Sequence, residues 1–414
     1  MSRLCDGFRQ HVPSVRKGGL TPLSRLRRVR ASASCSGEGT AVAVVSTFGI
    51  EEEFVFLDPE TLRPADVAEG AFDHLHARPE LARITHREFL ASQVEHASAV
   101  FTSTDAAHNA LVGFRRELAA EAERLGVVIA SVGMPPDAYG FPTVTDLPRY
   151  LRIVEDMGGV IADHQIQGLH VHVGVADHDD GIRALNATRT WLPLFSALTG
   201  NSPIWRGHDT GFESWRNVAQ RRWTTTGCPP IFRDGADYDR RLERLIGVGG
   251  MKDQAIIMWN ARLSSHVPTV EIRVADAQLE AWSAVLLAAL FRALVACVVD
   301  ESLESEAAVK PTSEAAPGPE LLNASLMHSA HSGLSGTVLD PVLAELLPAA
   351  EVLERCIRVL QPGLEAAGDL ELAREGMARL LREGTGAARQ RTAFAAGGVQ
   401  GLGKLYGERF AAAG

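Results

Sequence analysis

The segment FGIEEEFVFLD, residues 48–58, constrains the fold more than any other part of the chain. Its aromatic and aliphatic residues are typical of a buried strand, yet three consecutive acids interrupt them. Alternate side chains of a strand share one face, so Glu51 and Glu53 point to the same side and Glu52 to the other. A buried carboxylate without a partner costs several kcal/mol. We therefore expect the fold to bring cations to this strand.

Two carboxylates on one strand face suit a hard divalent cation, and Mg²⁺ or Mn²⁺ is the expected ion at Glu51 and Glu53. The alternative is a strand at the edge of a sheet, with solvated acids. The segment SQVEHAS supplies one more acid, Glu95, between apolar neighbours.

Two further candidate strands repeat this arrangement. GLHVHVGV places His170 and His172 on one face, where they could bind a metal, contact a phosphate or be satisfied core histidines. TVEIRVAD places Glu271 and Arg273 on one face, as an ion pair or as a metal ligand beside a phosphate-binding guanidinium. Several strands thus direct acids or histidines to one side of the predicted sheet.

The segment NSPIWRGHDTGFESWRNVAQRRW concentrates four arginines among hydroxyl and amide donors, which favours the binding of carboxylates or phosphates. Its alternative is a solvated basic helix face, above all at Arg221 and Arg222. A sheet face rich in cation ligands suits an anionic substrate such as ATP. The sequence contains no Walker-type loop and no GxGxxG before a helix, so metals and arginines would hold the nucleotide.

Composition excludes several other classes of protein. A formal charge of −10 over 414 residues argues against nucleic acid as a partner. The longest apolar stretch, around Ala284–Val299, contains Arg292 and predicts a core helix rather than a membrane span. The five cysteines are scattered, which favours a reducing, cytoplasmic setting.

The chain divides into an unusual amino-terminal segment and a longer globular part. Residues 1–40 are rich in Arg and Ser and suit a disordered extension, an upstream start codon or a transit peptide. Residues 41–414 alternate strands and helices, with a helix over residues 104–125, a hairpin turning near His266–Pro268 and a mostly helical part over residues 279–414.

Six motifs, in this order, make the chain resemble the carboxylate–amine ligase family, also called glutamate–cysteine ligase type 2 or YbdK-like. They are GIEEEF, VEHAS, GLHVHVGV, NSPIWRGHDTGFESWR, TVEIRVAD and GTGAARQR. The resemblance covers residues from about Thr47 to the carboxyl terminus. It implies an α+β, glutamine-synthetase-like catalytic fold, in which helices lie outside a curved antiparallel sheet.

The resemblance also implies an activity. Family members join the γ-carboxylate of glutamate to an amine such as that of cysteine, consume ATP and pass through an acyl phosphate. By position, the expected Mg²⁺ ligands are Glu51, Glu53, Glu95, His170 and Glu271. Arg273 matches a transition-state arginine and, with Glu53, the catalytic machinery. His172, Arg206, Thr210, Ser214 and Arg216 are the expected contacts to nucleotide or substrate carboxylates.

One segment departs from the family pattern W-R-A-A-R-x-G-L. Here it reads MHSAHSGL, with Met327, His328 and His331 in place of Trp and two Arg. This departure has two explanations. Either the acyl donor or the amine acceptor differs from glutamate and cysteine, or the sequence of a helix surface has drifted. Two other classes remain open: a zinc amidohydrolase that uses the His170-Val171-His172 strand, and an inactive family member. A homodimer or larger oligomer is the default expectation.

Overall fold

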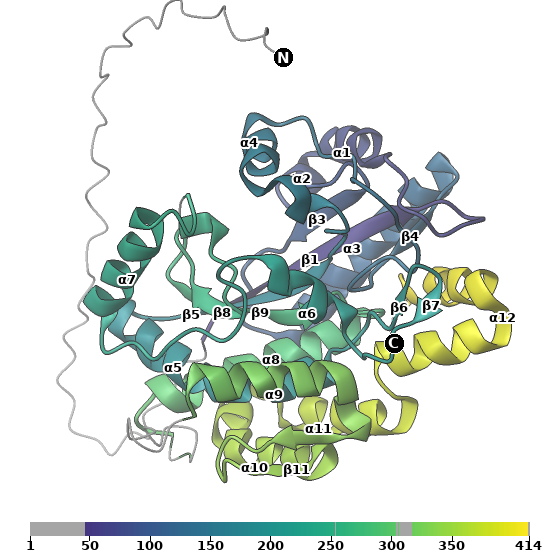
Figure 1. Ribbon diagram of the computed structural model, residues 1–414. Coiled ribbons are helices and arrows are strands. Elements are labelled where there is room, and N and C mark those ends of the chain that lie inside the picture. The colour runs from purple at the N-terminus through teal and green to yellow at the C-terminus, as the bar shows by residue number, and fades with distance from the viewer. Residues whose placement is uncertain (1–45, 253, 304, 306–316, 413–414) are drawn as a thin grey trace, which may run out of the picture. The chain divides into compact units, whose positions relative to one another are not determined.

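A seven-stranded sheet forms the centre of the fold in the computed structural model, which describes residues 46–252, 254–303, 305 and 317–412 (Figure 1). β1 (Phe48–Leu57) lies between β3 and β5, the strand order is β2-β3-β1-β5-β9-β8, and β4 also pairs with β1. All these pairs are antiparallel. The other strands are β2 (Thr85–Arg87), β3 (Gln93–Ala97), β4 (Val128–Ala130), β5 (Gly168–Gly174), β8 (Ala261–Leu263) and β9 (Thr269–Asp276). The extension predicted for residues 1–40 lies outside the described residues.

Helices precede and follow this sheet, and the chain after β9 is mostly helical. The α-helices are α1 (Ala68–His76), α2 (Pro79–Ala82), α3 (Thr104–Leu125), α4 (Pro148–Met157), α5 (His178–Leu198), α6 (Trp215–Ala219), α7 (Gly235–Gly247), α8 (Ala281–Val299), α9 (Pro319–Ser332), α10 (Ala349–Ala367), α11 (Leu370–Glu383) and α12 (Gly386–Arg409). Short 3-10 helices are η1 (Gly158–Ile161), η2 (Gln220–Arg222), η3 (Gln254–Ile256) and η5 (Gly333–Ser335). Two small hairpins complete the fold: β6 (Ile204–Trp205) with β7 (His208–Asp209), and β10 (Thr337–Leu339) with β11 (Leu346–Pro348).

Helix α3 shows how local sequence sets an element and its position. The Ser103 hydroxyl accepts a hydrogen bond from the Ala106 N–H at its amino end, and Gly126 ends it in the left-handed conformation with φ +70°. Leu111, Phe114 and Leu118 are buried at helical spacing in the helix that the sequence predicted over residues 104–125. The apolar face of α3 therefore packs into the protein interior.

The middle acid of the EEE motif is explained by α3. Glu52 points away from Glu51 and Glu53 and is fully buried, and so is its ion-pair partner Arg115 on α3. The same guanidinium donates to the carbonyl oxygens of Gln278 (2.9 Å), Leu279 (3.0 Å) and Phe410 (3.2 Å). Glu52 therefore has a structural role on the helix-covered face of the sheet.

Helix α8 is the long apolar helix that the sequence predicted for the core. It is long and apolar enough to cross a membrane, but 83% of its most apolar stretch is buried inside the protein. Its arginine, Arg292, is buried and pairs with the Asp369 carboxylate, which also accepts a hydrogen bond of 2.9 Å from Thr104. Helix α8 packs against α3, α5, α10 and α11, and Figure 1 shows it below the sheet strands, as expected of a core helix.

The predicted hairpin is present as β8 and β9, and β9 carries an irregularity next to β5. Leu169 and Val171 of β5 are two residues apart, but they pair with Ala275 and Ile272 of β9, which are three residues apart. β9 therefore has one extra residue, which forms a β-bulge. Such bulges redirect side chains and are common beside active sites. This bulge lies at Arg273, on the side of the sheet where the acids gather.

Candidate active site

The strand register brings the predicted site residues side by side. Across β1 and its neighbours, Glu51 lies opposite His170 and Glu53 lies opposite Glu95. Across β5 and β9, His172 lies opposite Glu271. Directly opposed residues in antiparallel strands have Cβ atoms about 4.5–5.5 Å apart, so their side chains meet. The alternating pattern of the sequence therefore becomes one continuous polar surface.

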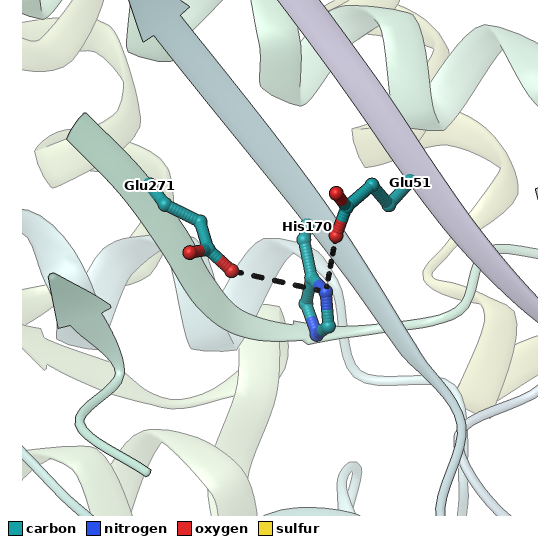
Figure 2. A group of neighbouring side chains, drawn as sticks. All are labelled: Glu51, His170 and Glu271. Atoms are coloured by element: carbon teal, nitrogen blue, oxygen red, sulfur yellow. Dashed lines mark hydrogen bonds and ion pairs between the residues drawn. The ribbon is translucent and has the colours of Figure 1, made fainter. Parts of the chain in front are cut away.

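Four of these residues form what we call the histidine cluster: Glu51, His170, His172 and Glu271. Figure 2 shows Glu51, His170 and Glu271 approaching one another from three neighbouring strands, and one donor atom from each lies within 4.8 Å of the others. His170 Nδ1 lies 3.1 Å from Glu51 Oε2, and His172 Nε2 lies 3.3 Å from Glu51 Oε1. His172 Nδ1 lies 2.9 Å from the Thr269 hydroxyl. These donors are suitably placed to hold one divalent cation.

The surroundings of the histidine cluster lower the pKa values of its carboxylates and keep them charged. Burial alone would raise the pKa of Glu51, but its hydrogen bonds to His170 and His172 outweigh burial and lower the pKa. The pKa of Glu271 is also lowered, because Arg273 and Arg262 outweigh its burial. Burial lowers the pKa of His170, so its imidazole is neutral and can donate a lone pair to a metal.

A second group, which we call the acidic cluster, consists of Glu53, Glu88 and Glu95. Glu53 accepts a hydrogen bond of 2.5 Å from the Gly168 N–H. Burial and the nearby Glu53 charge raise the pKa of Glu88 to about 8. Burial and the charges of Glu88, Glu51 and Glu53 also raise the pKa of Glu95. This cluster holds more negative charge than its neighbours neutralise.

Arginines border both clusters. Arg262 Nε donates to Glu271 Oε2 at 2.8 Å, and Arg273 pairs with the other oxygen of the same carboxylate. Arg216 is buried, and its guanidinium donates to the carbonyl oxygens of Arg273 (3.3 Å) and Val274 (3.5 Å). A Cβ atom at Gly168 would come within 2.5 Å of this guanidinium, so a larger residue there would displace Arg216.

Both clusters line one cavity of about 380 Å³. Its wall also includes the following residues from α4, the 164–166 segment, the 216–223 segment and the β8 side: Arg149, Tyr150, Ile153, His164, Ile166, Arg216, Gln220, Trp223, Ile256, Met258, Arg262, Ser264, Ser265 and His266. A second, more apolar slot of about 220 Å³ adjoins it and shares Ile153, Trp223, Ile256 and Met258. The site thus combines a charged chamber with an apolar side chamber.

Eight of the predicted site residues line this cavity: Glu51, Glu53, Glu95, His170, His172, Arg216, Glu271 and Arg273. Three others do not line it. Arg206 lies in the tight β6–β7 turn with φ +52° and pairs with Asp163 at 2.6 Å. The Thr210 hydroxyl donates to the Pro203 carbonyl at 2.9 Å, and the Ser214 hydroxyl donates to Asp276 Oδ1 at 2.7 Å.

The segment that departs from the family pattern also lies outside the cavity wall. Met327 borders a separate space of about 10 Å³ between α9 and the 217–226 segment. His328 Nε2 lies 2.9 Å from the Thr337 hydroxyl, and the His331 ring packs edge-on against Phe212. These three residues contact neighbouring helices and loops, which favours drift of a helix surface over a changed substrate pocket.

Arg262 and Glu88 are among the cavity residues that the sequence analysis did not predict, although a signal existed for Arg262. Arg262 lies opposite Glu271 in the β8–β9 hairpin, and a turn near His266–Pro268 already places these two positions together. Glu88 directly follows the short strand β2, and no periodic pattern marks it. Its place beside Glu53 depends on the path of the loop between β2 and β3.

Comparison with known proteins gives a consistent family. The sequence matches the model of glutamate–cysteine ligase family 2 over residues 47–406. It is 40% identical over 349 residues to "Putative glutamate--cysteine ligase 2-1" of Saccharopolyspora erythraea, covering 84% of this chain and 90% of the relative. The corresponding Nocardia farcinica protein is 37% identical, with 84% and 89% covered. Neither a zinc amidohydrolase nor an inactive member finds support here.

Solved structures support the same fold. A bifunctional glutathione synthetase from Pasteurella multocida matches with a TM-score of 0.63 at 15% identity, covering 89% of this chain and 52% of that chain. A glutamate–cysteine ligase from Francisella tularensis, solved with AMP, matches with a TM-score of 0.57 at 12% identity, covering 89% of each chain. The glutamine-synthetase-like fold expected from the sequence is therefore confirmed.

Proposed function

Since the chain belongs to glutamate–cysteine ligase family 2, and is therefore an ATP-dependent ligase that forms carbon–nitrogen bonds, we propose that it makes γ-glutamyl amides. The γ-carboxylate oxygen of glutamate attacks the γ-phosphorus of ATP, and the bond to ADP breaks. The amine of cysteine, or of another amino acid or amine, then attacks the acyl carbon. Phosphate leaves, and the attacking nitrogen loses a proton.

The observation that carries this proposal is the pairing of two carboxylate clusters with arginines in one cavity. A carboxylate and a triphosphate repel each other, so bringing them together demands cations. The cavity offers Arg216, Arg262 and Arg273, and carboxylates enough to hold metal ions. In the described part of the cavity wall, no serine or cysteine is paired with a base as an activated nucleophile would be.

The donor set fits Mg²⁺ or Mn²⁺, which prefer oxygen ligands. Glu51, His170 and Glu271 would hold one ion. We assign a second ion to Glu53, Glu88 and Glu95, which line the same cavity. The raised pKa values of Glu88 and Glu95 support this assignment, because these carboxylates lack neutralising partners in the protein. Bound ions would supply positive charge against the charge that develops during transfer.

The surroundings of Arg273 support its role as a transition-state arginine. Burial lowers its pKa, but the nearby acids, Glu271 first, raise it overall, so the guanidinium is always charged. Glu271 fixes one side of this guanidinium while the cavity exposes it to substrate. Its charge would stabilise the transferring phosphoryl group.

The apolar slot suits the nucleoside part of ATP. Trp223, Ile256 and Met258 line both the slot and the charged chamber, so a base in the slot would lie next to the chamber that holds the clusters. Arg206, Thr210 and Ser214 remain predicted substrate contacts. Their contacts support a second role, because Ser214 and the Ser202 hydroxyl both bind Asp276 and thereby fix the segment that carries Arg216. Cytoplasmic localisation and a homo-oligomer remain predictions from sequence.

The decisive experiment incubates the purified protein with ATP, Mg²⁺, glutamate and a panel of amino acids and amines. We expect ADP release that depends on both glutamate and an acceptor, and a product with the mass of their amide. Hydroxylamine in place of the acceptor should yield a γ-glutamyl hydroxamate, which is diagnostic of an acyl phosphate. The proposal would be refuted if ADP is released without a carboxylate substrate. It would also be refuted if no acceptor gives ADP release.

A further inference from the structure

Helix α4 brings a fourth arginine to the cavity, and we propose that Arg149 binds a free carboxylate group of an amino-acid substrate. This inference rests on the proposed ligase function and adds a specificity-determining residue to it. The carboxylate has two possible sources: the α-carboxylate of the acyl donor and the carboxylate of an amino-acid acceptor. The experiment below distinguishes them.

Arg149 differs from the other cavity arginines in having no partner. Arg262 and Arg273 share the Glu271 carboxylate, and Arg216 is buried and donates to backbone carbonyls. Arg149 lines the same cavity but is exposed, with no hydrogen bond or ion pair to any described residue between 46 and 412. Its five donors are therefore available to a ligand, and a guanidinium matches a carboxylate in a bidentate fashion.

The position of α4 indicates which part of the substrates Arg149 would meet. The Tyr150 hydroxyl donates to the Arg87 carbonyl at 3.0 Å, and its ring packs edge-on against Phe89 at 5.5 Å, beside Glu88. Further along the helix, Ile153 and Met157 line the apolar slot. Arg149 lines the charged chamber but not the nucleoside slot, and its neighbour Tyr150 lies near the acidic cluster.

The charge at that end of the cavity explains why such a residue is needed. Glu53, Glu88 and Glu95 line the chamber there, so a substrate carboxylate at that end meets acidic side chains, which offer it no cationic partner. The γ-carboxylate of glutamate is consumed in the reaction, but its α-carboxylate stays charged throughout, as does that of an amino-acid acceptor. An uncommitted guanidinium at this position compensates for that charge.

Three variants test the inference. Arg149→Ala removes the guanidinium, Arg149→Lys keeps a charge without the bidentate fork, and Arg152→Ala is the matched control on the same helix. Arg152 is exposed and does not line the cavity. KM and kcat are measured with cysteine as acceptor and with cysteamine, the same amine without its carboxylate.

We expect Arg149→Ala to raise one KM about tenfold to a hundredfold, the range for losing a charge-assisted hydrogen bond, with KM for ATP unchanged. Arg149→Lys should fall between Ala and wild type. If the group is the donor's α-carboxylate, KM for glutamate rises with both acceptors. If it belongs to the acceptor, KM rises for cysteine but not for cysteamine. The inference is wrong if neither KM changes, or if Arg152→Ala has the same effect.

Equilibrium dialysis of labelled glutamate and cysteine, with Mg²⁺ and a non-hydrolysable ATP analogue, separates this inference from the proposed function. Weaker binding to Arg149→Ala supports the role of Arg149 even if wild type makes no amide. Equal binding to wild type and Arg149→Ala contradicts it even if wild type is a γ-glutamyl ligase.

Discussion

The histidine cluster and the acidic cluster share one cavity and one strand, but their electrostatics are opposite. Glu51 and Glu53 are two residues apart on β1, one in each cluster. In the histidine cluster, imidazoles and guanidinium groups outweigh burial and lower the pKa values of Glu51 and Glu271. In the acidic cluster, burial and like charges raise the pKa values of Glu88 and Glu95.

This difference teaches what each half of the cavity requires. The histidine cluster is neutralised by the protein itself, so it should keep its geometry without any ligand. The acidic cluster lacks such partners, and an external cation is the simplest group that would complete it. We therefore expect the acidic half to depend on metal supply more strongly than the histidine half, where Arg262 and Arg273 already neutralise charge.

The largest expected effect tests the histidine half. Arg273→Ala should lower the rate of ADP release about 10³-fold or more, because an arginine beside a transferring phosphoryl group contributes on that scale. The fold should survive, since Arg262 still pairs with the buried Glu271 carboxylate when Arg273 is removed. ADP release and thermal unfolding are measured beside Arg358→Ala, an exposed arginine on α10. Turnover near the control value would exclude Arg273 from catalysis.

Glu52, the middle acid of the EEE motif, lies on the opposite face of β1 and allows the two faces to be compared. Glu52→Gln leaves the buried Arg115 charge without its carboxylate and should destabilise the protein by about 3–5 kcal/mol. Denaturant unfolding measures this change. Glu53→Gln, one residue away on the cavity face, should cost far less stability while it removes most ADP release. Equal stability losses in the two variants would show that the two faces do not differ as described.

The acidic half should respond to metal concentration. Glu88→Gln removes one ligand and should lower ADP release about 10–100-fold at limiting Mg²⁺, the scale seen when a metal site is weakened. Raising Mg²⁺, or replacing it with Mn²⁺, should restore part of the rate. Arg273→Ala should show no such rescue. A Glu88→Gln enzyme with unchanged Mg²⁺ dependence would remove Glu88 from the metal site.

Much of the site could be predicted from the sequence because strand periodicity fixes which side chains share a face. That rule placed Glu51 with Glu53, His170 with His172 and Glu271 with Arg273. Counting residues back from the predicted hairpin turn would also have placed Arg262 opposite Glu271. The paths of loops and the placement of α4 follow no such period, so Glu88 and Arg149 were missed.

The 201–216 segment shows that composition alone does not identify substrate contacts. Its arginines and hydroxyls suggested substrate contacts, but most serve turns and helix ends within the fold. The carboxyl-terminal motif GTGAARQR helps to hold this segment: Arg391 pairs with Asp209 at 2.9 Å, and the Thr385 hydroxyl donates to Glu213 at 2.8 Å. Composition identified donors, but not whether backbone or substrate would use them.

The smallest expected effect concerns pH and stability without metal. Because the folded pKa of Glu88 is about 8 and that of an ordinary glutamate about 4.5, the folded state binds more protons between these values. Its contribution to stability is complete below about pH 4.5 and is lost as pH rises toward 8. The melting temperature of metal-free protein should therefore fall by a few degrees between pH 6 and about 8.5.

Mg²⁺ should reduce this fall because it favours the charged carboxylates, and Glu88→Gln should flatten it without metal. A melting temperature that rises across this range would mean that the acidic cluster is neutralised from within, as the histidine cluster is.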